Sequence, residues 1–97
     1  MMVLITYDVE TKTSKGQKRL RRVAKLCENY GQRVQNSTFE CVLEPAVFAD
    51  LKHRLEAEID KKKDSLRFYY MGSNWHNRIE HMGVKSSYNP EADTLMI

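Results

Sequence analysis

The first hydrophobic stretch of the chain, residues 3–9, is rich in β-branched and aromatic side chains and is apolar on both alternating faces. This pattern predicts a central strand that is buried on both sides. The next stretch predicts an amphipathic helix, with Ser14 and Gln17 as a capping box at its start and Gly31 as a left-handed stop at its end. Its apolar stripe recurs at helical spacing, at Leu20, Val23, Ala24 and Cys27.

The hydrophobic positions then change their phase. Val34 starts one alternation and Phe39 starts another, so the polar residues 35–37 mark a tight turn or a bulge. We therefore expect two short strands here, at about 33–36 and 38–44.

A second helix and a last core strand follow. Pro45 suits the first position of a helix. Residues 65–71 alternate between two sets of side chains up to Gly72, as expected of a strand. The second helix has a buried stripe formed by Phe48, Leu51, Leu55 and Ile59.

The predicted order of elements is strand, helix, strand, strand, helix, strand, which is that of the ferredoxin-like α+β fold. In this fold a four-stranded antiparallel sheet carries both helices on one face. Apolar positions on the other face then require a partner: another subunit, a nucleic acid or a ligand. Residues 1–72 form this core domain, and residues 73–97 form a C-terminal extension. Because the extension ends in apolar residues from Leu95 to Ile97, we expect a short terminal strand on a sheet edge; a loose tail with incidental apolar residues is the alternative.

Composition excludes several classes of protein. The 97 residues are 41% hydrophobic and 30% charged, which suits one soluble domain. The longest apolar run is far shorter than the roughly 20 residues of a membrane span. A secretory signal pattern is absent as well, so we expect a cytoplasmic protein without a membrane partner. Cys27 and Cys41 match no paired-cysteine spacing, and two small buried side chains explain them better than a redox pair.

The net charge of +3 is modest, but the basic residues are concentrated on the first helix. Such a face attracts phosphate groups without reading any sequence, although charged helix faces are usually only solvated. We expect the following residues to contact nucleic acid: Lys15, Lys18, Arg19 and Arg22.

Four segments of the chain resemble the family of CRISPR-associated protein two: Thr6–Val9, the basic helix, Arg33–Glu40 and Asp64–Tyr69. They lie in the order and at the spacing of that family. The resemblance implies a ferredoxin-like homodimer whose two sheets pack face to face. It also implies a metal-dependent endonuclease that acts on RNA or duplex DNA, and a role in spacer acquisition beside the CRISPR integrase, CRISPR-associated protein one.

Asp8 is the candidate metal ligand, because it ends the first strand beside loops. A carboxylate there can bind Mg²⁺ (or Mn²⁺), which keeps its other positions for water and phosphate. One carboxylate is too few, so the site requires two copies of Asp8 across a two-fold axis, sharing a metal that activates water. A structural carboxylate that caps the adjoining loop is the alternative. The resemblance favours the metal and adds Tyr7 as a catalytic candidate, although packing in the core explains Tyr7 as well.

Arg33 and Phe39 resemble residues near the dimer cleft of that family. Arg33 could neutralise phosphate and Ser37 could donate a hydrogen bond to it, although a solvated arginine and a turn serine are equally good accounts. We expect Phe39 to pack in the core or between subunits rather than to stack on a base, and we expect Leu95 and Ile97 to pack between subunits.

Two functions remain open from the sequence. The first is a metal-dependent endonuclease, and the second is a non-catalytic dimeric scaffold that binds duplex DNA and bridges integrase dimers. A general RNA-recognition module is disfavoured, because residues 38–44 lack its basic-glycine-aromatic run.

Overall fold

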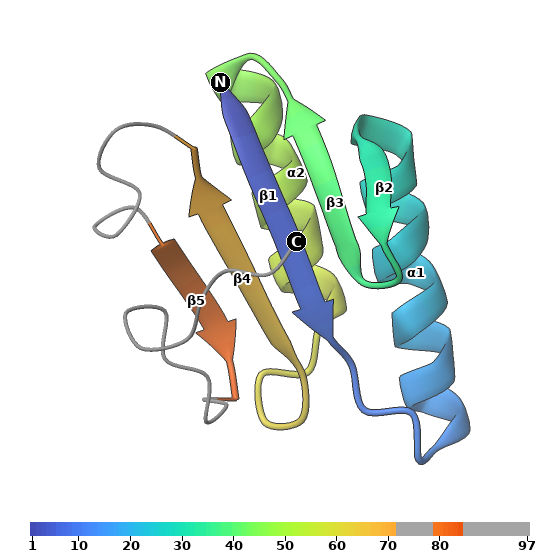
Figure 1. Ribbon diagram of the computed structural model, residues 1–97. Helices are drawn as coiled ribbons and strands as arrows, with labels where there is room; N and C mark the ends of the chain where they lie inside the picture. Colours follow the sequence, from blue (N-terminus) through green and yellow to red (C-terminus); the bar gives the residue numbers. More distant parts are fainter. Residues whose placement is uncertain (72–78, 85–97) are drawn as a thin grey trace.

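The computed structural model describes residues 1–71 and 79–84. The described elements form one antiparallel sheet with strand order β2-β3-β1-β4-β5, and both helices cover one face of it (Figure 1). This arrangement confirms the α+β, ferredoxin-like prediction. The elements are β1 (Met2–Asp8), α1 (Ser14–Tyr30), β2 (Gln32–Gln35), β3 (Thr38–Val42), α2 (Pro45–Glu58), β4 (Ser65–Tyr70) and β5 (Ile79–Gly83).

The central strand β1 divides its side chains between the two faces of the sheet, because successive residues of a strand point to opposite sides. Tyr7 belongs to the buried cluster beneath the helices, so its neighbour Asp8 points the other way. We call that other side, with Leu4, Thr6 and Asp8 of β1, the far face. The buried cluster takes alternate strand residues and the inner stripes of both helices, including Val3, Ile5, Tyr7, Phe39, Cys41, Leu66, Phe68, Val23, Cys27, Phe48, Leu51 and Leu55.

The ends of α1 differ from the prediction. The N-cap is Thr13, whose side chain accepts a hydrogen bond from the Gly16 N–H at 3.1 Å, and Ser14 is already helical. Threonine and serine have the same capping chemistry, so the capping pattern locates the N-cap only to within one residue. Gly31 is not left-handed, since its φ is −151°. It is needed for space instead, because a Cβ there would lie 2.4 Å from the Cys41 Sγ.

The hairpin of β2 and β3 confirms the two short strands. The register shifts between Arg33 and Gln35, so the bulge lies just before the polar run, and the tight turn lies within that run at residues 36–37. Helix α2 begins at Pro45 as predicted and buries Phe48, Leu51 and Leu55.

Strand β5 was not predicted, and it adds part of the expected extension to the core sheet. It pairs with β4 through Ser65 and Gly83. Its pattern is hidden because Glu80 occupies a position on the helix side, where its carboxylate accepts a hydrogen bond from the Tyr70 hydroxyl at 2.8 Å and pairs with Lys52. The expected terminal strand with Leu95 and Ile97 lies outside the described residues. Within the described ranges, neither helix is long and apolar enough to cross a membrane.

Candidate active site

Asp8 is exposed at the last position of β1, opposite Ser65 of β4. No hydrogen bond or ion pair joins its carboxylate to another side chain in residues 1–71 and 79–84. Those ranges also contain no group of three His, Cys, Asp or Glu residues that could hold a metal. Oxygen ligands suit Mg²⁺ or Mn²⁺, and one carboxylate with several waters is a common arrangement for Mg²⁺. Within the described residues, Asp8 therefore offers one carboxylate toward such a site, without a surrounding cluster of metal-binding side chains.

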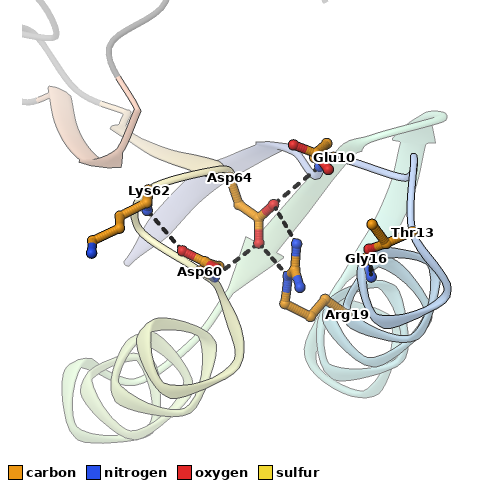
Figure 2. A network of polar contacts seen from close by, with 7 residues as sticks. All are labelled: Glu10, Thr13, Gly16, Arg19, Asp60, Lys62 and Asp64. Atoms are coloured by element: carbon orange, nitrogen blue, oxygen red, sulfur yellow. Dashed lines mark hydrogen bonds and ion pairs between the residues drawn. The ribbon is translucent and has the colours of Figure 1, made fainter.

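The residues beside Asp8 are held by a buried carboxylate, that of Asp64, which has no exposed surface. Asp64 lies directly before β4 and links three segments of the chain (Figure 2). Its Oδ1 accepts from the Glu10 N–H at 3.0 Å and from Arg19 Nη2 at 3.3 Å. Its Oδ2 accepts from Arg19 Nε at 2.7 Å and from the Asp60 N–H at 2.9 Å. Both oxygens are thus satisfied by two donors each.

These contacts set the charge of the pair. Burial works to raise the pKa of the Asp64 carboxyl, but the hydrogen bonds from Arg19, Asp60 and Glu10 and the charge of Arg19 hold that pKa below its usual range. The hydrogen bond to Asp64 in turn raises the pKa of Arg19. Asp64 is therefore ionised at neutral pH, and the pair is a true ion pair.

Arg19 is placed differently from the other basic residues predicted to bind nucleic acid. Its side chain is only 15% exposed, and its guanidinium is directed at Asp64. Two of its donors are therefore already used within the chain. A phosphate contact by Arg19 stays a prediction. In the structure its guanidinium is already paired with Asp64.

Tyr7 is not brought together with Asp8. Its ring is 6% exposed and stacks on Phe39, with ring centroids 6.1 Å apart, on the helix side of the sheet. Burial raises the pKa of Tyr7, so its hydroxyl stays protonated near neutral pH. The structure supports the role in core packing rather than a catalytic role beside Asp8.

Arg33 and Phe39, predicted near the dimer cleft, and Ser37, predicted to bind phosphate, also have partners within the chain. Phe39 is fully buried in the core of its own subunit, so its ring has no exposed surface to offer a second subunit. Arg33 lies 4.9 Å above the Phe39 ring centroid and pairs with Glu28 at 2.9 Å. Ser37 lies in the turn between β2 and β3, where its carbonyl accepts from the Tyr7 N–H at 3.1 Å.

Lys15, Lys18 and Arg22 are exposed on α1 as predicted. Two of them border a groove of about 840 Å³ between α1 and α2, which we call the interhelical basic groove. Because both helices lie on the same face of the sheet, this groove is on the opposite side from the far face. The groove is lined by Lys18, Arg21, Arg22, Lys25, Arg54, Leu26, Ala57 and Glu58.

Two contributors to these sites escaped the sequence reasoning. Arg54 comes from α2, so the charge run on α1 gave no sign of it. Asp64 had a weak signal, an acidic residue directly before a buried strand, but its partners Glu10 and Arg19 are more than forty residues away.

Comparison with known proteins agrees with this architecture. A family model described as CRISPR associated protein Cas2 matches residues 1–79. The chain is 58% identical over 96 residues to the CRISPR-associated endoribonuclease Cas2 of Nitratidesulfovibrio vulgaris, covering 99% of this chain and 94% of that protein. It is 54% identical over 91 residues to the CRISPR-associated endonuclease Cas2 of Halalkalibacterium halodurans, covering 94% and 95%.

A comparison with a solved structure leads to the same family. The crystal structure of Streptococcus pyogenes Cas2 at pH 6.5 superposes with a TM-score of 0.69 at 64% sequence identity, over 86% of this chain and all of that one. Sequence and fold therefore lead to one family, and the chain belongs to the CRISPR-associated Cas2 proteins.

Proposed function

We propose that the protein is a metal-dependent endonuclease of CRISPR spacer acquisition, and that it acts in the cytoplasm as a homodimer in which two copies of Asp8 share one Mg²⁺ or Mn²⁺ ion. The observation that carries this proposal is the exposure of Asp8 at the end of the central strand, with both carboxylate oxygens available. Relatives named as endoribonuclease and endonuclease support cleavage of a phosphodiester in RNA or DNA.

For the proposed hydrolysis, the main task of the chain is to hold the Asp8 carboxylate in position. A bound metal supplies Lewis-acid activation of water and neutralises charge on the phosphate. Asp8 provides a hard oxygen ligand, and its exposed position leaves space for a phosphodiester. The dimer supplies the second carboxylate, because two copies of Asp8 hold the ion more firmly than one carboxylate does.

The far face offers a surface for that dimer. Met2 pairs with Val42, which places Val42 on this face, and Val42 is 71% exposed. Met71, whose N–H bonds the Met2 carbonyl, is 38% exposed. Exposed apolar side chains on a sheet face are typical of an association surface, and they support packing of two sheets.

Nucleic-acid binding is supported by the basic residues on the helix side. Lys15, Lys18 and Arg22 and the interhelical basic groove present several cations and one acidic residue, Glu58. Such a surface binds the phosphate backbone through charge and counterion release, which suits a protein that acts on many sequences.

The test is cleavage of an RNA and of a duplex DNA by Asp8→Asn and by the unchanged protein, with Mg²⁺, with Mn²⁺ and with a chelator. We expect cleavage to fall by about 100-fold or more in Asp8→Asn, because a metal ligand is lost. Glu44→Gln is the matched control, since Glu44 is an exposed acid that makes no side-chain cap bond. Cleavage by purified Asp8→Asn at the unchanged rate contradicts the proposal.

One observation favours a second function, that of a non-catalytic scaffold. In the described ranges no group of three His, Cys, Asp or Glu residues that could hold a metal forms around Asp8. A dimer that binds duplex DNA and bridges dimers of the CRISPR integrase, CRISPR-associated protein one, needs no metal site. If no condition gives cleavage while binding to DNA and to the integrase persists, the scaffold is the function.

A further inference from the structure

The carboxylate of Asp64 stands where the connections β1–α1 and α2–β4 meet α1 (Figure 2). Its side chain bonds Glu10 in the first connection, Asp60 in the second and Arg19 on the helix. Asp60 is itself held in a turn, since its own carboxylate accepts from the Lys62 N–H at 2.9 Å. One buried charge thus ties three parts of the chain to each other.

This cluster adjoins Asp8 on both sides of the chain. Glu10, whose N–H donates to Asp64, is two residues beyond Asp8. Ser65, the residue after Asp64, is the partner of Asp8 across β1 and β4. The Asp64 carbonyl also accepts from the Val84 N–H at 2.8 Å, directly after β5. The backbone that carries Asp8 is therefore fixed from its own strand and from the neighbouring one.

A buried ion pair is a costly way to stabilise a fold, because apolar side chains of similar volume often do so as well or better. An ion pair with several hydrogen bonds does, however, fix the relative orientation of the groups that it joins. The planar guanidinium of Arg19 meets both oxygens of Asp64, and the two backbone donors complete the four bonds that a carboxylate readily accepts. Each bond fixes an angle as well as a distance, so the cluster restricts where the end of β1 can lie.

We propose that Asp64, held by Arg19, is a positioning residue for Asp8: it fixes the end of β1 so that the Asp8 carboxylate takes one place relative to its copy in the dimer. This inference rests on the proposed function. A metal shared between two subunits makes the placement of each ligand critical. Partners of ligating groups typically change metal affinity or activity by about 10–100-fold when they are removed.

The experiment compares Asp64→Asn, Arg19→Lys and Asp8→Asn with the unchanged protein, at a temperature at which all remain folded dimers by circular dichroism and ultracentrifugation. Arg19→Lys keeps the positive charge and loses the two-pronged contact, so it tests the geometry even if Asp64→Asn does not fold. We expect Asp64→Asn and Arg19→Lys each to lower kcat by about tenfold, while the KM for nucleic acid changes less than about twofold. Binding of Mn²⁺ in the absence of nucleic acid, measured by electron paramagnetic resonance, should weaken by a similar factor.

The matched control is Glu56→Gln, which breaks the exposed ion pair of Glu56 with Lys61 at 2.6 Å, and should change neither kcat nor Mn²⁺ binding. A rise in KM with constant kcat in Arg19→Lys would assign this residue to phosphate binding and overturn positioning. Unchanged kcat and Mn²⁺ affinity, with cleavage lost in Asp8→Asn, overturn the positioning role alone. Cleavage that persists in Asp8→Asn overturns the proposed function, and the positioning role with it.

Discussion

Asp8 and Asp64 lie at the same end of the sheet, on the two paired strands β1 and β4 or directly beside them, and their surroundings are opposite. Asp64 is fully buried and accepts four hydrogen bonds. Asp8 is exposed, and its carboxylate makes no hydrogen bond or ion pair with the other described side chains. A carboxylate whose oxygens are all satisfied has no capacity left for a metal or for water. The comparison therefore separates the acid that holds the structure from the acid that is available for chemistry.

The largest expected effect concerns stability. Asp64→Ala should lower the free energy of unfolding by about 3 kcal/mol, because it leaves two partly buried backbone donors and an arginine without their acceptor. Asp8→Ala should change it by less than about 0.5 kcal/mol, as is usual at exposed positions. Urea denaturation followed by circular dichroism measures both. Equal losses in the two variants would remove the distinction between the two acids.

A smaller effect is expected from acid. The pKa of Asp64 in the folded protein is below the ordinary value of 3.8, so the unfolded chain binds more protons as the pH falls. The stabilisation by Asp64 is therefore complete above about pH 4 and is lost as the pH falls through the lower native pKa. We expect the free energy of unfolding to decline less steeply below pH 4 in Asp64→Asn than in the unchanged protein. Parallel curves would show that this carboxyl does not titrate with folding.

The smallest expected effect concerns exposed basic residues of the interhelical basic groove. Lys25→Gln combined with Arg54→Gln, on opposite sides of the interhelical basic groove, should weaken duplex DNA binding a few-fold and reduce its salt slope by about 1–2. The melting temperature should stay close to that of the unchanged protein, because both side chains are exposed. Fluorescence anisotropy at several salt concentrations measures the slope. An unchanged slope would exclude phosphate contacts in the groove.

The parts of the fold that were predicted are those in which a local pattern decides the outcome. The apolar spacing of α1 and α2 and the alternation in β4 need no knowledge of distant residues. Strand β5 was missed because Glu80, a charged residue, takes a position on the helix side that only Tyr70 and Lys52 make acceptable. Tyr70 and Lys52 lie 10 and 28 residues before Glu80, so the short window of β5 itself does not contain the explanation.

The candidate site divides in the same way, into residues that a local pattern predicts and residues whose partners are distant in sequence. The position of Asp8 at a strand end followed from the pattern, and strand alternation alone already separates it from Tyr7. The family resemblance predicted both residues as catalytic candidates, but the structure places their side chains on opposite faces of the sheet. The ion pair of Arg19 with Asp64 could not be read from the sequence, because a basic helix face looks the same whether each cation meets solvent or a buried acid.

The bond between Glu10 and Asp64 spans 54 residues of chain. A contact that closes so long a loop carries an entropic cost until the intervening strands and helices have assembled. Glu10 lies two residues after the end of β1 and Asp64 directly before β4, and these strand ends are paired, so this bond needs that pairing in place. Protection of the Glu10 amide from solvent exchange thus reports, at a single atom, that these two strands have docked.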